Sequence, residues 1–328
     1  MRCAVVGGGA WGTALADMLA TSGHDVRLWA LEADVIRSVN ATHQNPVFLP
    51  GFTLAPALVA AGDHSAVLSG AEFVIYATPS QHLREIARAG QAHVATDAVC
   101  AVASKGIEAG TLALMSDVVA DELKGREVVA VSGPTFAAEV AARMPTAIVA
   151  ASTSHAAARI TQDVMSNATF RVYTHDDVIG VELGGALKNV MAVATGIVEG
   201  VGLGYNSRAA LITRGIAEMT RLGVALGARG STFAGLAGIG DLVLTCTGAL
   251  SRNHQVGIEL AKGRKLAEII GSMRTVAEGV KTTRATVALA ARHGVEMPIT
   301  RQVHRILEGE VSPRDAIREL MERSLKDE

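Results

Sequence analysis

The chain of 328 residues has few aromatic side chains, few cysteines, little net charge and no long unbroken apolar run. Aromatic residues make up only 3%, so Ala, Val, Leu and Ile must fill the core, and hydrophobic residues at 49% are enough to do so. The net charge of −2, with both signs mixed along the chain, gives no indication of a nucleic-acid or membrane-surface partner. No stretch approaches about 18 uninterrupted apolar residues, so no membrane insertion is expected.

The three cysteines, Cys3, Cys100 and Cys246, are far apart and form no C-x-x-C pair or metal-ligand group. We expect them to be small packing residues in a reducing compartment, and we expect no metal. The apolar N-terminal stretch is broken by glycines and by Asp17, so it does not fit a signal peptide. A cytoplasmic protein is expected.

A glycine-rich turn follows the first apolar run, residues 2–6. Gly7, Gly9 and Gly12 have the G-x-G-x-x-G spacing of a dinucleotide site, in which the glycines permit a tight turn, close approach of a pyrophosphate and close helix packing. Such turns also occur for packing alone. Here a second apolar run and Glu32, placed 20 residues beyond Gly12 where a ribose-binding carboxylate belongs, favour nucleotide binding.

The first half of the chain alternates apolar runs with helical stretches. Near-continuous apolar strands separated by helices predict a mostly parallel sheet with helices on both faces. The runs of strand length are 2–6, 25–30, 73–77, 98–102, 128–131, 146–150 and 170–173. We therefore expect an α/β, Rossmann-like domain over residues 1–176, with its ligands at the carboxyl ends of the strands.

The strand pattern stops after Asp176, and an all-helical domain over residues 177–328 is expected. Residues 178–201 are apolar and rich in Gly and Ala, which predicts a buried helix. A second helix is expected over 207–222, with Ser207 able to cap it, and Ser312 is expected to cap the last helix.

Three polar segments of the second half are candidates for chemistry. Lys188 lies on the apolar helix, where burial and a second cation would lower its pKa, although its stem could instead cover apolar surface. Asp241 lies between two glycines and an apolar helix, and could cap that helix or balance the charge of a lysine. In Ser251-Arg252-Asn253, an arginine at a helix start suits a bound phosphate, or it is an exposed side chain on a polar turn.

Taken together and in order, these segments give the chain a family resemblance. Gly-Ala-Leu-Lys-Asn-Val, Gly-Ile-Gly-Asp-Leu and Ser-Arg-Asn follow the predicted nucleotide-binding half. The chain thereby resembles the bacterial-type NAD(P)-dependent glycerol-3-phosphate dehydrogenases. Further matching segments are 45–51, 78–81, 104–106, 132–137 and 276–279.

The resemblance implies interconversion of sn-glycerol 3-phosphate and dihydroxyacetone phosphate, with NAD or NADP as cofactor, for phospholipid synthesis. It implies that Lys188 exchanges the proton, with Lys105 and Asp241 beside the reacting oxygen. The cofactor-binding residues expected are Gly7, Gly9, Ala10, Trp11, Gly12, Lys105, Ala137, Arg252, Val276 and Glu278. The substrate-binding residues expected are Lys105, Gly133, Thr135, Lys188, Asp241, Ser251, Arg252 and Asn253.

One position departs from the family pattern. Members often carry a basic residue just past the second strand, but here Leu31 and Glu32 stand there. This predicts that NAD is accepted at least as well as NADP. The alternatives are another two-domain dehydrogenase, of the β-hydroxyacid or ketopantoate type, and a non-catalytic NAD-binding sensor. A homodimer is possible under each of them.

Overall fold

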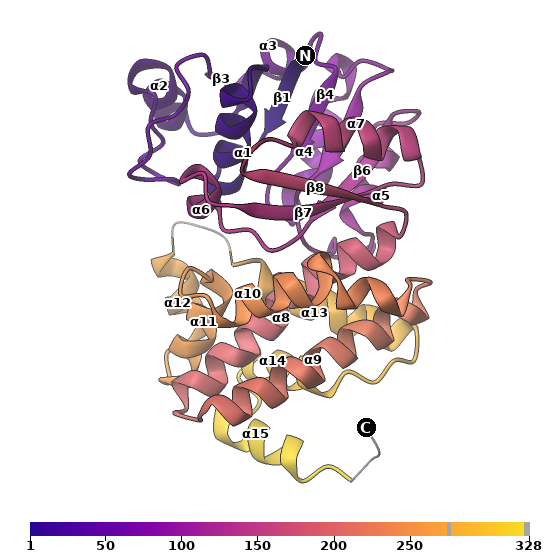
Figure 1. Cartoon of the computed structure of the whole chain (residues 1–328). Coiled ribbons are helices and arrows are strands. Elements are labelled where there is room, and N and C mark those ends of the chain that lie inside the picture. Colours follow the sequence, from indigo (N-terminus) through magenta and orange to yellow (C-terminus); the bar gives the residue numbers. More distant parts are fainter. Residues whose placement is uncertain (274–276, 325–328) are drawn as a thin grey trace.

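A sheet forms one half of the molecule and helices form the other (Figure 1). The computed structural model describes residues 1–273 and 277–324. The strands are β1 (Arg2–Val6), β2 (Asp25–Trp29), β3 (Val59–Ala61), β4 (Phe73–Tyr76), β5 (Val99–Val102), β6 (Glu127–Ser132), β7 (Thr146–Ala151) and β8 (Phe170–His175).

The eight strands form one sheet in the order β3-β2-β1-β4-β5-β6-β7-β8. All neighbours are parallel except β6 and β7, which run antiparallel. The prediction of a mostly parallel sheet is thus confirmed. The chain order reverses direction between β1 and β4, and such switch points are where open α/β sheets bind ligands.

Both faces of the sheet are covered, as predicted, because side chains alternate along each strand. In β1, Val5 packs with Leu15 of one helical layer, whereas Ala4 and Val6 pack with Leu83 of the other. One layer holds α1 (Ala10–Thr21), α2 (Ala33–Thr42), α6 (Ala137–Ala141) and α7 (His155–Met165). The other holds α3 (His64–Leu68), α4 (Leu83–Gly90) and α5 (Met115–Glu122).

The helical half is built around α8 (Val178–Gly200), which lies buried at its centre. The helices after α8 are α9 (Tyr205–Ala225), α10 (Asp241–Thr247), α11 (Arg252–Ala261), α12 (Leu266–Ser272), α13 (Glu278–Arg292), α14 (Pro298–Leu307) and α15 (Pro313–Met321). Of the described helices, α8 alone is long and apolar enough to cross a membrane, but 83% of its apolar window is buried inside the protein. It therefore has the character of a core helix.

Some local expectations need correction. Ser207 does not cap α9, because the helix begins at Tyr205 with Gly204 at its N-cap. The short strand β3 lacked a sequence signal, since it has only three residues. Ser312 does cap α15, accepting a hydrogen bond from the backbone N–H of Asp315.

Candidate functional site

The glycine turn between β1 and α1 leaves space where a ligand would need it. Gly7 has a φ of +126°, and a Cβ there would lie 2.6 Å from the Ala77 carbonyl oxygen. A Cβ on Gly12 would lie 1.9 Å from the Gly7 oxygen, so both positions require glycine. Gly9 has nothing within 4 Å of its Cβ position. The turn is closed on its protein side and open at Gly9, which fits a pyrophosphate.

The start of α1 lies at this opening. The helix begins at Ala10, and its N-cap residue Gly9 has no side chain to accept hydrogen bonds from the first turn. Among the described residues, the buried Nε1 of Trp11 has no hydrogen-bond partner. These donors, at the positive end of the helix dipole, suit an anionic ligand. Glu32, at the N-cap of α2, is partly buried, while Leu31 is 77% exposed.

Three charged side chains from distant parts of the chain meet in one cluster, which we call the lysine–aspartate cluster: Lys105, Lys188 and Asp241. The Lys105 Nζ lies 2.7 Å from Asp241 Oδ2. The Lys188 Nζ donates to the other carboxylate oxygen, Oδ1. Asp241 is fully buried and Lys188 is 6% exposed.

Close approach of helices brings the cluster together. Lys105 follows β5, Lys188 lies in the middle of α8, and Asp241 opens α10. A Cβ on Gly185 would lie 2.4 Å from Ser132 Oγ, at the carboxyl end of β6, and one on Gly184 would lie 2.2 Å from the Ala237 oxygen. Side chains at these positions would hold α8 away from the sheet and from the segment before α10.

The cluster sets the protonation of Lys188. Burial lowers the pKa of Lys188 to about 8; the Asp241 carboxylate opposes this shift and the Lys105 ammonium adds to it. Because Lys188 is only 6% exposed, the alternative in which its stem covers apolar surface and its ammonium reaches water is wrong. Asp241 likewise has no capping role: Gly240 occupies the N-cap of α10 and the Asp241 carboxylate faces the two lysines.

The segment after β6 joins this cluster. Gly133 has a φ of +146°, and its carbonyl oxygen accepts a hydrogen bond from Lys105 Nζ at 3.1 Å. The Thr135 hydroxyl donates to the same oxygen at 3.2 Å. Ala137 follows as the first residue of α6, partly buried against the sheet core.

Hydrogen bonds also connect the cluster to the strand ends near the glycine turn. Ser104, the neighbour of Lys105, donates through Oγ to the Thr78 carbonyl oxygen at 2.6 Å. Thr78 follows Ala77, the residue on which Gly7 packs. The carboxyl ends of β1, β4 and β5 therefore lie together beside the cluster, as the parallel sheet predicts.

The start of α11 approaches α8 from the other side. Ser251 caps α11 by accepting from the His254 N–H at 3.3 Å, and Arg252 is an exposed first-turn residue. The Asn253 amide donates to Asn189 Oδ1 at 2.9 Å and accepts from the Gly279 N–H at 2.9 Å. Because Asn189 adjoins the catalytic candidate on α8, this network holds the start of α11 next to the cluster.

Glu278 joins the two halves of the molecule. Its carboxylate accepts hydrogen bonds from the backbone N–H of Ser80 at 3.0 Å and from the Ser80 hydroxyl at 2.5 Å. Arg252 is close enough to interact electrostatically with the same carboxylate. Val276, the other cofactor candidate of this segment, lies outside the described residues.

Sequence reasoning missed three polar residues at this place. Asn189 orients Asn253, and the Thr245 hydroxyl lies 3.4 Å from Asp241 Oδ1. The buried Ser132 hydroxyl has no partner among the described residues. Helical spacing was an available signal for Thr245, four residues after Asp241, and Ser132 stands in the family-matching segment 132–137, which follows a predicted strand. Cys246 is buried, and burial raises the pKa of its thiol to about 12, as befits a packing residue.

Comparison with known proteins decides the family. The description of the NAD-dependent glycerol-3-phosphate dehydrogenase N-terminus matches residues 2–158, and that of the C-terminus matches residues 177–318. The chain belongs to the NAD-dependent glycerol-3-phosphate dehydrogenase family. This membership replaces the β-hydroxyacid and ketopantoate alternatives.

Relatives within the glycerol-3-phosphate dehydrogenase family match over the full length. The NAD(P)+ glycerol-3-phosphate dehydrogenase of Syntrophotalea carbinolica is 52% identical, over 100% of this chain and 99% of the relative. The one of Koribacter versatilis is 54% identical, over 98% of this chain and 97% of the relative. The crystal structure of the Coxiella burnetii glycerol-3-phosphate dehydrogenase has a TM-score of 0.94 and 41% identity, covering 98% of this chain and 99% of that one.

Proposed function

We propose that this chain catalyses the reversible NAD(P)-linked interconversion of sn-glycerol 3-phosphate and dihydroxyacetone phosphate. The observation that carries the proposal is the buried lysine–aspartate cluster beside the open glycine turn. The chemistry supplied by a bound nicotinamide is hydride transfer to or from the carbon that bears the reacting oxygen. The residues of the chain must then move the matching proton and hold the substrate.

Lys188 is the proton carrier in this proposal. With a pKa near 8, its Nζ is present in both the charged and the neutral form at neutral to mildly alkaline pH. The neutral amine takes the hydroxyl proton during alcohol oxidation. The ammonium returns a proton to the oxygen during ketone reduction.

Lys105 and Asp241 prepare this proton transfer. Asp241 holds both ammonium groups, one on each oxygen, so that they face the same place. The Lys105 side chain is placed to stabilise negative charge that develops on the substrate oxygen. Its second bond, to the Gly133 oxygen, keeps its Nζ at the edge of the sheet.

The substrate phosphate is assigned to the start of α11. Ser251, Arg252 and Asn253 present a hydroxyl, a guanidinium and an amide around the first-turn N–H groups, and this donor set suits a phosphate dianion. Gly133 and Thr135 are assigned to the substrate from the sheet side. The Arg252 side chain is exposed, so its guanidinium can reach a bound phosphate.

The cofactor is assigned to the glycine turn and the residues around it. Gly7, Gly9 and Gly12 shape the phosphate site, and Ala10 and Trp11 contribute the first turn of α1. Ala137, Lys105 and Arg252 are assigned to the nicotinamide side. Glu278 and Val276 complete the set.

We further propose two domains, residues 1–176 and 177–328, with the helical domain covering the carboxyl edge of the sheet. Such a cover keeps water away from the reacting carbon. We also propose that the protein acts in the cytoplasm as a homodimer and supplies glycerol 3-phosphate for phospholipid synthesis. Size-exclusion chromatography with light scattering tests the dimer.

The assay that tests the reaction is direct. Purified protein mixed with dihydroxyacetone phosphate and NADH or NADPH should make the reduced-cofactor absorbance fall, and ketopantoate should not replace the substrate. A sensor would bind the cofactor and leave the absorbance constant. That result would overturn the proposal.

The same assay tests cofactor choice. Exposed Leu31 offers no charge to a 2′-phosphate, and the Glu32 carboxylate repels one and suits a ribose hydroxyl. We expect kcat/KM for NADH to equal or exceed that for NADPH. A strong preference for NADPH would contradict this assignment.

A further inference from the structure

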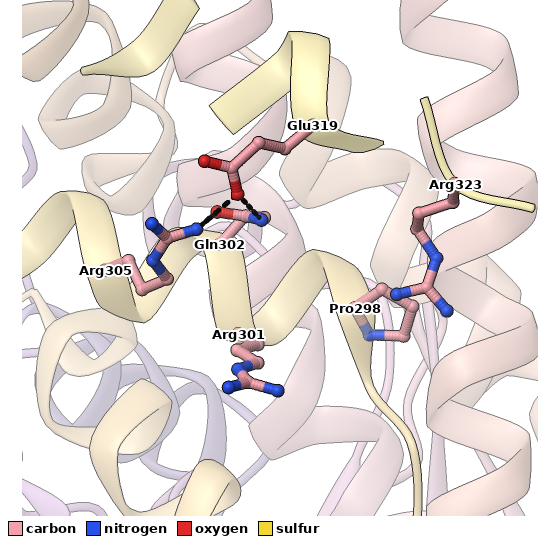
Figure 2. A pocket seen from close by; sticks show the side chains of 6 residues that line it. All are labelled: Pro298, Arg301, Gln302, Arg305, Glu319 and Arg323. Atoms are coloured by element: carbon pink, nitrogen blue, oxygen red, sulfur yellow. Dashed lines mark hydrogen bonds and ion pairs between the residues drawn. The ribbon is translucent and has the colours of Figure 1, made fainter. Parts of the chain in front are cut away.

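A polar cavity lies beside α14 and α15 of the helical half (Figure 2). Its volume is about 330 Å³. The lining residues are Pro298, Arg301, Gln302, Arg305, Glu319 and Arg323. Three of the six side chains are guanidinium groups, although the chain as a whole carries a net charge of −2.

One wall of the cavity is internally neutralised. The Glu319 carboxylate accepts hydrogen bonds from Arg305 and, at 2.9 Å, from Gln302 Nε2 (Figure 2). The Gln302 oxygen accepts from Arg305 Nη1 at 3.0 Å. The Arg305 guanidinium accordingly holds the pKa of Glu319 below its usual range. This network fixes Arg305 and pairs the single carboxylate of the lining, that of Glu319.

Arg301 carries the one positive charge of the lining that no carboxylate of the described residues neutralises, because Arg305 also lies 3.9 Å from Glu310 and Arg323 pairs with Glu296. Within the described ranges 1–273 and 277–324, no carboxylate lies within 4.0 Å of the Arg301 guanidinium. Arg323 donates to Glu296 at 2.5 Å, and Glu296 is not part of the lining. Arg301 and Arg305 are also one helical turn apart on α14, where like charges repel each other. A bound anion would relieve that repulsion.

The lining selects the kind of anion. Guanidinium forks match the oxygens of phosphate and carboxylate groups. Pro298 is the one apolar residue of the lining and no aromatic ring is present, so a nucleobase or an acyl chain would find no surface to pack on. We propose that this cavity binds a compact phosphate dianion, either inorganic phosphate or the phosphate monoester of a small metabolite.

This site is separate from the dehydrogenase machinery. None of its residues belongs to the lysine–aspartate cluster or to the start of α11. Glu319 and Arg323 lie beyond residues 177–318, the part that matches the family description. The other four lining residues, on α14, lie inside that part, and none of the six takes part in the proposed reaction.

Isothermal titration with inorganic phosphate tests the proposal, at an ionic strength kept constant with sodium chloride. The R252Q variant is the background, because it weakens phosphate binding in the cleft. We expect R252Q to keep one phosphate site, and R252Q/R301Q to bind phosphate at least fivefold more weakly. The R252Q/R323Q variant should also bind phosphate more weakly than R252Q, which tests the site independently of Arg301.

Arg314 supplies the matched control, since it is an exposed arginine on α15 outside the lining. R252Q/R314Q should bind phosphate as R252Q does, within twofold. Equal affinity of R252Q/R301Q and R252Q/R314Q, or no phosphate site in R252Q, would overturn the proposal. A parallel titration with sn-glycerol 3-phosphate separates the two ligands: tighter binding than phosphate identifies a monoester site, and weaker binding identifies a site for the free ion.

Discussion

At the scale of single residues, the lysine–aspartate cluster places two cations on one buried carboxylate. A buried charge without a partner is costly, so each member of the cluster requires the others. Two ammonium groups against one carboxylate leave an excess positive charge, and that excess helps to keep Lys188 partly neutral. In the proposed reaction, two lysines on one carboxylate therefore favour proton transfer more than a single lysine–carboxylate pair would.

Replacing Lys188 by Ala removes the proton carrier while the glycine turn is left intact. We expect kcat to fall by about 10² to 10⁴-fold, the usual contribution of general acid–base catalysis. Cofactor affinity, measured by fluorescence titration, should stay within threefold of wild type. K281A, at an exposed lysine of α13, is the matched control and should turn over normally. Normal turnover by K188A would remove Lys188 from the mechanism.

The pKa of Lys188 also predicts the pH dependence. Alcohol oxidation requires the neutral amine, so its kcat/KM should rise as pH increases through about 8. Ketone reduction requires the ammonium, so its kcat/KM should fall over the same interval. Initial rates in both directions between pH 6 and pH 10, which is about two units either side of that value, measure this. Parallel profiles in the two directions would contradict the assignment.

The sequence indicated the burial of Lys188 better than it indicated the direction of the Asp241 carboxylate. An apolar helix around Lys188 is visible in the sequence, so its burial was expected. The direction of the Asp241 carboxylate was not, because capping and ion pairing use the same residue in the same local sequence. Whether Asp241 caps α10 or binds the two lysines depends on how close α8 passes to it, and the tertiary structure sets that distance.

At the scale of elements, the N-cap residue of α8 ties the start of that helix to the segment that follows α9. Asp177, at the N-cap, accepts hydrogen bonds from Gly180 N at 2.9 Å, Arg229 N at 2.9 Å and Thr232 Oγ1 at 2.5 Å. Burial raises the pKa of Asp177, but these hydrogen bonds outweigh it and the net pKa is lowered. Its stabilising effect is therefore present above the unfolded pKa, near 4, and is lost in acid as the pH falls through the folded value.

Replacing Asp177 by Ala should destabilise the protein by about 2 kcal/mol, because a cap is lost and the N–H of Arg229 loses its partner. Urea unfolding at pH 7 and at pH 3, on either side of the usual aspartate pKa of about 3.9, measures the effect. The difference from wild type should shrink at the lower pH. D163A, at an exposed residue of α7, should leave stability unchanged. An equally large effect at both pH values would contradict the role given to the carboxylate.

The strands and helices were largely predictable because burial on both sides makes parallel strands uniformly apolar. Runs such as 73–77 and 128–131 lie within one or two residues of β4 and β6. The antiparallel direction of β7 was not predictable, since an apolar run looks the same in either direction. The predicted start of α9 was wrong. The helix begins at Tyr205 with Gly204 as its N-cap residue, although Gly204 has no side chain that can cap and Ser207 has one.

At the scale of the whole molecule, the Ser80–Glu278 contact joins the two halves. Replacing Ser80 by Ala removes one of its two hydrogen bonds, and the remaining bond uses the backbone. We expect a double-mutant cycle of S80A and E278Q, followed by thermal unfolding, to give a coupling of about 1 kcal/mol. A Q91A variant, at an exposed glutamine of the short helix η2 (Gln91–His93), is the control. Additive effects of S80A and E278Q would show that the contact contributes nothing.

The division into a sheet half and a helical half was visible as the end of the strand pattern. How the halves face each other was not, because contacts such as Gly185 against Ser132 and Glu278 against Ser80 leave no hydrophobic signal in the sequence. Gly184 and Gly185 could be noticed in the sequence, but their partners, Ala237 and Ser132, are known only from the fold.

Helix α8 starts against the sheet, where Val181 packs with Ala130 and Val149, and continues into the core of the other half. At 23 residues it is a single rod of about 35 Å anchored at both ends. Because α8 packs against both halves, movement of the halves relative to each other should not displace Lys188. We therefore expect the amine of Lys188 to keep its place beside Asp241 as the halves move, so that the proton carrier of the proposed reaction is in position before substrate binds.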